Sequence, residues 1–187
     1  KILKDTVGMN RLLVGRKTLH RYYYFNEAIN VKDCDNFVSK YKKLDFKSGE
    51  VRSFDEKNNV KWVEQESIRK AKTYWAEVND AVVRAIWSYV LGVNQNYKFN
   101  LTGFSKAQLT RYNKGDFYGW HQDSFYHTER DKSERKLTAV LQLSKPEDYE
   151  GCELQLFNGE NELEELPIKN QGSIVVFRSE EWHRVTK

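Results

Sequence analysis

The chain is poor in cysteine, proline and long apolar runs, and each shortage excludes a class of protein. Two cysteines, Cys34 and Cys152, are too few for a disulfide framework, so we expect reduced thiols in a cytoplasmic protein. Two prolines and ten glycines argue against a long disordered linker. No stretch approaches the roughly 18 uninterrupted apolar residues that a membrane helix requires, and the first residues lack the apolar run of a secretory signal. We therefore expect no membrane partner.

The sequence does contain enough apolar material for one full-sized core. Hydrophobic residues make up 39% of the 187 residues and aromatic residues 14%, so we expect a single domain over residues 1–187. The formal net charge of +4 is unevenly spread, because residues 1–120 hold 22 basic side chains against 13 acidic ones. Such a surface is compatible with a nucleic-acid partner. An ordinary solvated helical surface is the simpler interpretation, because the basic residues form no run interleaved with aromatic side chains.

Hydrophobic periodicity predicts helices first and short strands afterwards. Asn30 is expected to cap a helix whose apolar stripe reaches Leu44, and residues 45–60 are expected to form a loop. A second helix is predicted over residues 72–91, with Gly92 as its stop. Strands are predicted at residues 21–25, 108–112, 119–124, 136–143, 152–157 and 173–177. This order predicts an α+β protein with helices packed on one face of a β-sandwich or barrel.

Two histidines and one aspartate form the strongest chemical signal. His121 and Asp123 lie two positions apart in a predicted strand, so their side chains should point into the same pocket. His183 comes from a second segment and is expected to complete the set. Two imidazoles and a carboxylate can occupy one face of an octahedral metal and leave three adjacent positions open. This arrangement suits a non-haem Fe(II) that binds a cosubstrate and O2. On spacing alone, hydrogen-bonded histidines without a metal are the alternative.

Four ordered segments resemble a known enzyme family. They are residues 112–123, 135–144, 145–154 and 183–186. Together they resemble the prolyl 4-hydroxylase-like Fe(II)/2-oxoglutarate dioxygenases, in particular the PKHD-type hydroxylase branch. Ile68-Arg69-Lys70 and residues 94–101 match more weakly. Cys152 stands where the family has the second glycine of a Gly-Gly pair, which suggests a slightly different backbone geometry at that turn.

The resemblance implies a double-stranded β-helix, or jelly-roll, with supporting helices. Residues 1–20 would then form an N-terminal arm, residues 21–105 a mainly helical support, and residues 106–187 the jelly-roll core. The implied chemistry uses Fe(II), 2-oxoglutarate and O2, with ascorbate as a candidate additional cofactor. It hydroxylates an unactivated C–H and releases succinate and CO2. The implied substrate is a prolyl or other side chain of a protein or peptide. A nucleic acid base, a small metabolite and a catalytically inactive binding module are the alternatives.

The resemblance also carries roles onto individual residues. His121, Asp123 and His183 are the implied metal ligands. The implied cosubstrate-binding residues are Tyr112, Thr138, Gln142, Leu154 and Val185. For Tyr112, Leu154 and Val185, ordinary core packing is the alternative role. Three aromatic residues flank the ligands, namely Tyr118, Trp120 and Trp182. They are expected either to line the substrate entrance or to shield the metal from water. His127 is expected to be an exposed loop histidine rather than a fourth ligand.

One family feature has no clear counterpart here. The resemblance implies an arginine or lysine on the last core strand, beyond the distal histidine, that pairs with the 5-carboxylate of 2-oxoglutarate. The sequence ends at Lys187, soon after His183. The alternatives are a sequence that is cut short before this strand, Lys187 as a substitute, or a differently held cosubstrate. We favour the first, because a jelly-roll without its last strand would expose an edge of its core. Arg111 and Arg178 are remote alternatives.

Overall fold

The computed structural model describes residues 20–124, 134–157, 159 and 163–187. The helices are α2 (Val31–Tyr41), α3 (Ala81–Tyr97) and the 3-10 turn η1 (Pro146–Asp148). The strands of the first half are β1 (Tyr22–Phe25), β2 (Lys47–Ser48), β3 (Glu50–Phe54), β4 (Val60–Glu64), β5 (Arg69–Lys70) and β6 (Lys72–Ala76). The later strands are β7 (Ala107–Arg111), β8 (Phe117–His121), β9 (Leu137–Leu141), β10 (Leu154–Phe157), β11 (Leu163–Glu165), β12 (Ile174–Arg178) and β13 (His183–Val185). The predicted arm (except for His20) and His127 lie outside the described residues.

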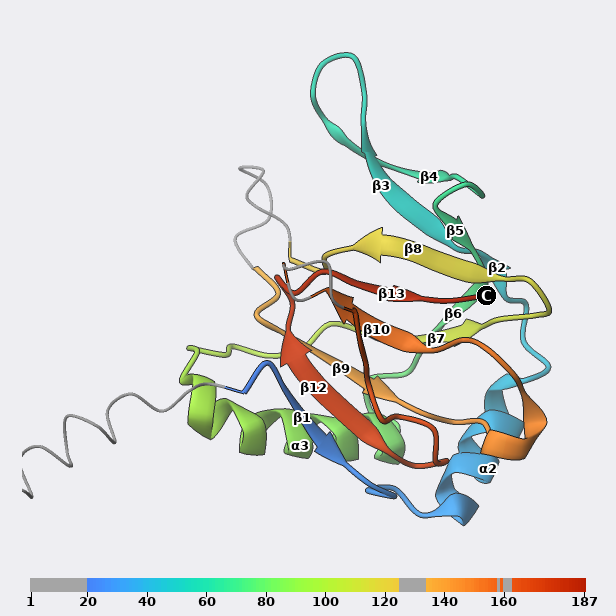
Figure 1. The fold of residues 1–187 in the computed structure, drawn as a ribbon, viewed down its shortest axis with the longest axis vertical. Helices are drawn as coiled ribbons and strands as arrows, with labels where there is room; N and C mark the ends of the chain where they lie inside the picture. The colour runs from blue at the N-terminus through green and yellow to red at the C-terminus, as the bar shows by residue number, and fades with distance from the viewer. Residues whose placement is uncertain (1–19, 125–133, 158, 160–162) are drawn as a thin grey trace, which may run out of the picture.

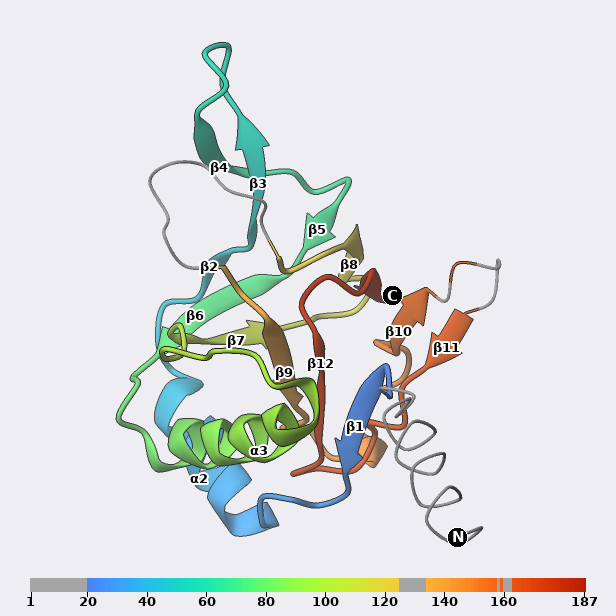
Figure 2. The same ribbon diagram turned by 90° about the vertical axis from the view of Figure 1, so that its left-hand side faces the viewer.

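Two antiparallel sheets form the centre of the molecule (Figures 1 and 2). One has the strand order β11-β10-β13-β8-β5 and the other the order β1-β12-β9. A cluster of buried apolar side chains lies between them and joins Leu154 and Leu156 of the first sheet to Val175 and Phe177 of the second. The predicted jelly-roll fold is therefore confirmed. Among the described residues, no helix is long and apolar enough to cross a membrane.

Strand β12 separates two apolar layers. Its residues Ile174 to Phe177 are 0% exposed, which confirms the prediction of a fully buried strand at this position. Ile174 and Val176 pack into the cluster that contains the helices, whereas Val175 and Phe177 pack between the two sheets. The alternation follows directly from the two-residue period of a strand. Helices α2 and α3 therefore cover the outer side of the β1-β12-β9 sheet and leave its inner side for the site.

The sequence predicted helix α2 correctly but placed the start of helix α3 too early. For α2 the prediction is confirmed, since the Asn30 side chain accepts a hydrogen bond from the backbone N–H of Asp33. The helix predicted over residues 72–91 is wrong, because its first part is strand β6, paired with β7. Helix α3 begins after Asp80, whose side chain accepts from the N–H of Val82, and it continues past Gly92. The apolar residues of β6 happen to match a helical spacing, which made the two elements look like one.

The expected loop over residues 45–60 is also wrong. This segment contains β2, β3 and the start of β4, and β3 and β4 pair as an antiparallel hairpin that projects from the body of the molecule (Figure 1). The turn is closed by Asp55, whose carboxylate accepts hydrogen bonds from the N–H groups of Lys57 and Asn59. Because the hairpin buries few side chains, its strands carry little apolar alternation. Residues 21–105 thus hold strands β1 to β6 as well as two helices.

Strands β7 and β9 each end a sheet. In the described part of the chain, β9 pairs with β12 alone, and β7 pairs with β6 alone in the sheet β2-β6-β7. All residues of β9 are partly exposed, whereas its neighbour β12 is buried over Ile174–Phe177. The division of the chain into arm, support and incomplete core stays a prediction.

Candidate metal centre

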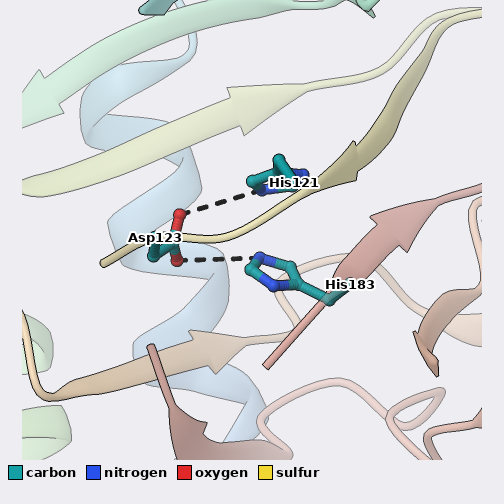
Figure 3. A group of neighbouring side chains, drawn as sticks. All are labelled: His121, Asp123 and His183. Carbon is teal, nitrogen blue, oxygen red and sulfur yellow. Dashed lines mark ion pairs between the residues drawn. The ribbon is translucent and has the colours of Figure 1, made fainter. Parts of the chain in front are cut away.

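The three predicted ligands converge on one point (Figure 3). His121 is the last residue of β8 and His183 the first of β13, and the two are direct partners across the strands. Asp123 follows β8 and lies beside both imidazoles. Its carboxylate oxygens are 3.7 Å from Nε2 of His121 and 3.6 Å from Nε2 of His183. One ligand atom from each residue lies within 4.8 Å of the others, and no other such group of histidine, cysteine and acidic residues occurs among the described residues.

Backbone carbonyls fix the orientation of both imidazoles. Nδ1 of His121 donates to the carbonyl of Gly119 at 2.8 Å, and Nδ1 of His183 donates to the carbonyl of Glu181 at 2.9 Å. A carbonyl oxygen can only accept, so the proton of each neutral ring stays on Nδ1. The Nε2 lone pairs are then free and point toward Asp123. This is the tautomer that a metal bound at Nε2 requires.

The electrostatics favour the neutral form of His121. Burial, together with the neighbouring imidazole of His183, lowers the pKa of His121 from its ordinary 6.5 to about 4. The side chain of His183 is only 5% exposed. Metal ligation needs deprotonated nitrogen, so His121 is prepared to bind a cation at neutral pH without first losing a proton. Two imidazole nitrogens and one carboxylate form a donor set that fits Fe(II).

Two hydroxyl residues hold Asp123, Thr138 at its carboxylate and Ser179 at its backbone. Thr138 on β9 donates its hydroxyl hydrogen to Oδ2 of Asp123 at 2.8 Å, and the hydroxyls of Thr138 and Ser179 lie 2.9 Å apart. Ser179 is 0% exposed, and its carbonyl accepts from the backbone N–H of Asp123 at 2.9 Å. Thr138 therefore contacts the carboxylate of a candidate ligand, while its predicted contact with the cosubstrate stays a prediction. Ser179 was not predicted, because nothing in its sequence context marks it.

The other four predicted cosubstrate-binding residues lie in different surroundings. Leu154 and Val185 are partners across β10 and β13 and pack in the apolar cluster between the sheets. Burial strongly raises the pKa of Tyr112, so its hydroxyl keeps its proton and can donate. Gln142 lies just beyond β9, where its side-chain amide donates to the carbonyl of Ser144 at 3.3 Å. Their roles toward a cosubstrate stay predictions.

A register shift between β8 and β13 places Tyr118 in different surroundings from Trp120 and Trp182. Between His121 and Tyr118 the register against β13 shifts by one residue, so that both side chains lie on the same side. The rings of Tyr118 and His121 stack at 3.5 Å with an interplanar angle of 12°. Trp120 and Trp182 instead line a separate hollow of about 230 Å³ with Phe157. Only Tyr118 contacts a candidate ligand directly, and an entrance role for the two tryptophans stays a prediction.

One buried cation beside the candidate metal centre, Arg69, was given no role from the sequence. Arg69 on β5 is 6% exposed, and the central carbon of its guanidinium lies 4.4 Å from the ring centroid of Tyr118. Its positive charge is also among the influences that lower the pKa of His121. The weak match of Ile68-Arg69-Lys70 to the family pattern was the available signal, but it did not indicate what the residue contacts.

The basic residues considered from sequence lie in other surroundings. Nζ of Lys187 is 5.4 Å from the ring centroid of Phe117. Arg178 pairs with two carboxylates, those of Glu180 at 3.0 Å and Glu181 at 2.5 Å. Arg111 is exposed, donates to the carbonyl of Lys42 at 3.0 Å and stacks on Phe46. Arg178 and Arg111 are therefore already engaged away from the metal ligands.

Comparison with known proteins gives one family and a group of solved structures. The family model of the 2OG-Fe(II) oxygenase superfamily matches residues 107–187, which include all three candidate ligands. No curated protein matches the chain in sequence.

The similar solved structures share the fold over most of this chain. A prolyl-4-hydroxylase from Pseudomonas putida has a TM-score of 0.68 at 21% identity, covering 89% of this chain and 85% of that one. A prolyl hydroxylase from Trichoplax adhaerens, solved with a peptide fragment of the hypoxia inducible factor oxygen degradation domain, has a TM-score of 0.63 at 17% identity, covering 98% and 85%. A viral collagen prolyl hydroxylase from Paramecium bursaria Chlorella virus-1, in its 2OG complex, has a TM-score of 0.61 at 18% identity, covering 89% of each chain.

Proposed function

Because residues 107–187 belong to the 2OG-Fe(II) oxygenase superfamily, we propose that this enzyme hydroxylates an unactivated C–H in a side chain of a protein or peptide. A prolyl side chain is the first candidate. The observation that carries the proposal is the cluster of His121, Asp123 and His183, whose ligand atoms lie within 4.8 Å of one another. Fe(II), 2-oxoglutarate and O2 would supply the oxidising chemistry, with release of succinate and CO2.

The chain's own residues position these groups and exclude water. Nε2 of His121 and of His183 and the carboxylate of Asp123 would hold the metal from one side and leave the other side open. The Thr138 hydroxyl fixes the rotation of that carboxylate through a hydrogen bond of 2.8 Å. Leu154 and Val185 provide apolar walls between the sheets. We propose that Tyr112, with its protonated hydroxyl, and Gln142 are the polar contacts of the cosubstrate.

The choice of substrate rests on the named relatives of the fold. The three solved structures described above are prolyl hydroxylases, and one of them was solved in complex with a peptide fragment. We also propose a reducing compartment such as the cytoplasm, which is supported by the free thiols of Cys34 and Cys152.

The test measures succinate release from a panel of proline-containing peptides, with Fe(II) and 2-oxoglutarate supplied. We expect peptide-dependent succinate release and a mass increase of the peptide by one oxygen atom. The Asp123→Ala variant removes the only anionic ligand and should abolish both signals while its circular dichroism stays native. If that variant turns over normally, the metal assignment is wrong. If succinate forms only with a nucleic acid or a small metabolite, the peptide substrate is wrong, and a fully inert wild type would point to a binding module.

A further inference from the structure

Each oxygen of the buried Glu181 carboxylate is held by a different arginine. Glu181 is 8% exposed and lies in the turn between β12 and β13, two positions before His183. Arg21 donates to Oε2 from Nη2 at 2.7 Å and from Nε at 3.2 Å. Arg178 donates to Oε1 from Nη2 at 2.5 Å. Both contacts join an ionised donor to an ionised acceptor, and such hydrogen bonds are roughly twice as strong as neutral ones.

The two arginines tie this turn to both central sheets. Arg178 is the last residue of β12, and Arg21 directly precedes β1, the strand that pairs with β12. Nη2 of Arg21 also donates to the carbonyl of Phe157, the last residue of β10 in the other sheet, at 2.7 Å. A buried carboxylate is costly unless it is paired. The turn is therefore held where Glu181 reaches both cations.

Backbone carbonyls of the same turn hold two of the three candidate ligands. The carbonyl of Ser179 accepts from the backbone N–H of Asp123 at 2.9 Å. The carbonyl of Glu181 itself accepts from Nδ1 of His183 at 2.9 Å. The carbonyl between them accepts from the side-chain amide of Gln122, which separates the two ligands of the β8 segment, at 2.6 Å. A shift of this turn would therefore move hydrogen-bond acceptors of the metal centre.

We propose that Glu181 is a positioning residue of the metal centre, an inference that rests on the proposed function. Its carboxylate fixes the backbone of the turn, and that backbone fixes the ring of His183 and the main chain of Asp123. With the proton held on Nδ1, Nε2 of His183 keeps its lone pair for the metal. Without the carboxylate, Arg21 and Arg178 lose their common partner. The turn can then relax, and its carbonyl no longer selects one tautomer of His183.

The first measurement is the tautomer of the two histidines in the metal-free protein. Nitrogen chemical shifts of labelled imidazole rings, recorded near neutral pH, distinguish a proton on Nδ1 from one on Nε2. We expect the Nδ1 form for both rings in the wild type. Glu181→Ala should give a mixture of tautomers at His183. His121 serves as the internal control, because its Nδ1 donates to the carbonyl of Gly119, and it should keep the Nδ1 form.

The second measurement is the affinity for Mn(II), determined by calorimetry. Glu181→Ala should weaken binding by about 10-fold and Glu181→Gln, which keeps one acceptor oxygen, by about 3-fold, because residues that orient a ligand typically contribute 10- to 100-fold. The matched control is Asp80→Ala. Asp80 also has a largely buried carboxylate that pairs with a cation, Lys40, but it lies at the start of α3. This control should lower stability and change neither the Mn(II) affinity nor the tautomer of His183.

Two results would overturn the proposal. One is a Glu181→Ala protein in which either the Mn(II) affinity or the His183 tautomer is that of the wild type. The other is an equal loss of affinity in Asp80→Ala, which would reduce the effect to general stability. Should Glu181→Ala fail to fold, Glu181→Gln decides, and an unchanged affinity there contradicts the proposal. A wild type that binds no Mn(II) refutes the proposed function instead, and the tautomer in the metal-free protein then still tests Glu181.

Discussion

At the scale of single residues, the carboxylate of Asp123 depends on the hydroxyl of Thr138. We predict that Thr138→Val weakens Mn(II) or Fe(II) binding by about 10-fold, because residues that orient a metal ligand typically contribute 10- to 100-fold in affinity. Thr138→Ser keeps the hydroxyl and should bind nearly as the wild type does. Equilibrium dialysis of the three proteins measures the effect. Equal affinities in all three would show that Asp123 is oriented by its backbone contact with Ser179 alone.

The lowered pKa of His121 gives a prediction for the metal-free protein. In the unfolded chain this imidazole takes up a proton near its ordinary pKa of 6.5, whereas in the folded chain it does so only near 4. The unfolded state therefore binds more protons between these values, and the free energy of unfolding should fall as the pH drops through this range. Urea unfolding at pH 7.5, 5.5 and 4.5 measures it. A His121→Asn variant should lose part of this pH dependence, and an identical profile in both proteins would contradict the lowered pKa.

The ligand triad was predictable from sequence, but the residues around it were not. Strand alternation was enough to bring His121 and Asp123 together, and His183 was the matching partner from a distant segment. The register shift that turns Tyr118 toward His121 left no mark in the sequence, so Tyr118 was grouped with Trp120 and Trp182. Ser179 and Arg69 reach the centre only through tertiary pairing of strands, which no local pattern reports.

At the scale of elements, the start of α3 is the most testable feature. Asp80 caps the helix through Val82 and also accepts from Lys40 and Tyr41 of α2. We predict that Asp80→Ala lowers the free energy of unfolding by about 1–2 kcal/mol, the usual cost of losing such a cap. Urea unfolding measures it. Glu77→Ala, an exposed acidic residue just before the helix, serves as the control, and an equal effect in both variants would contradict a specific role of the cap.

The errors in element prediction share a physical origin. Periodicity identified α2 and β12 because each buries a full apolar face. It failed for β6, because the pattern of Thr73 to Trp75 fits either a strand or a helix. Only the pairing with β7 makes this segment a strand. It failed again for the β3–β4 hairpin, whose side chains are largely solvated. Asp80, which caps α3, marks the boundary between the two elements that apolar spacing alone did not indicate.

At the scale of the whole molecule, metal binding should be coupled to stability. The three candidate ligands come from β8, from the segment after it and from β13, so one bound ion would join these three segments. We predict that saturating Mn(II) raises the melting temperature and that a chelator reverses the rise, with about 2.7 kcal/mol expected at a metal concentration 100 times the Kd. Calorimetry with and without chelator measures it. The Asp123→Ala variant should show no response, and an unresponsive wild type would contradict a metal centre.

The partial exposure of β9 has a consequence for how long a metal ion would stay bound. Thr138 holds the carboxylate of Asp123 from β9, and all residues of this strand are partly exposed, whereas most of β12 is buried. Brief local openings of a partly exposed strand need far less energy than global unfolding. Amide hydrogen exchange should then be faster in β9 than in buried β12. Ion release is expected to follow these openings, so the residence time of the metal would be set by one strand and would vary little with denaturant.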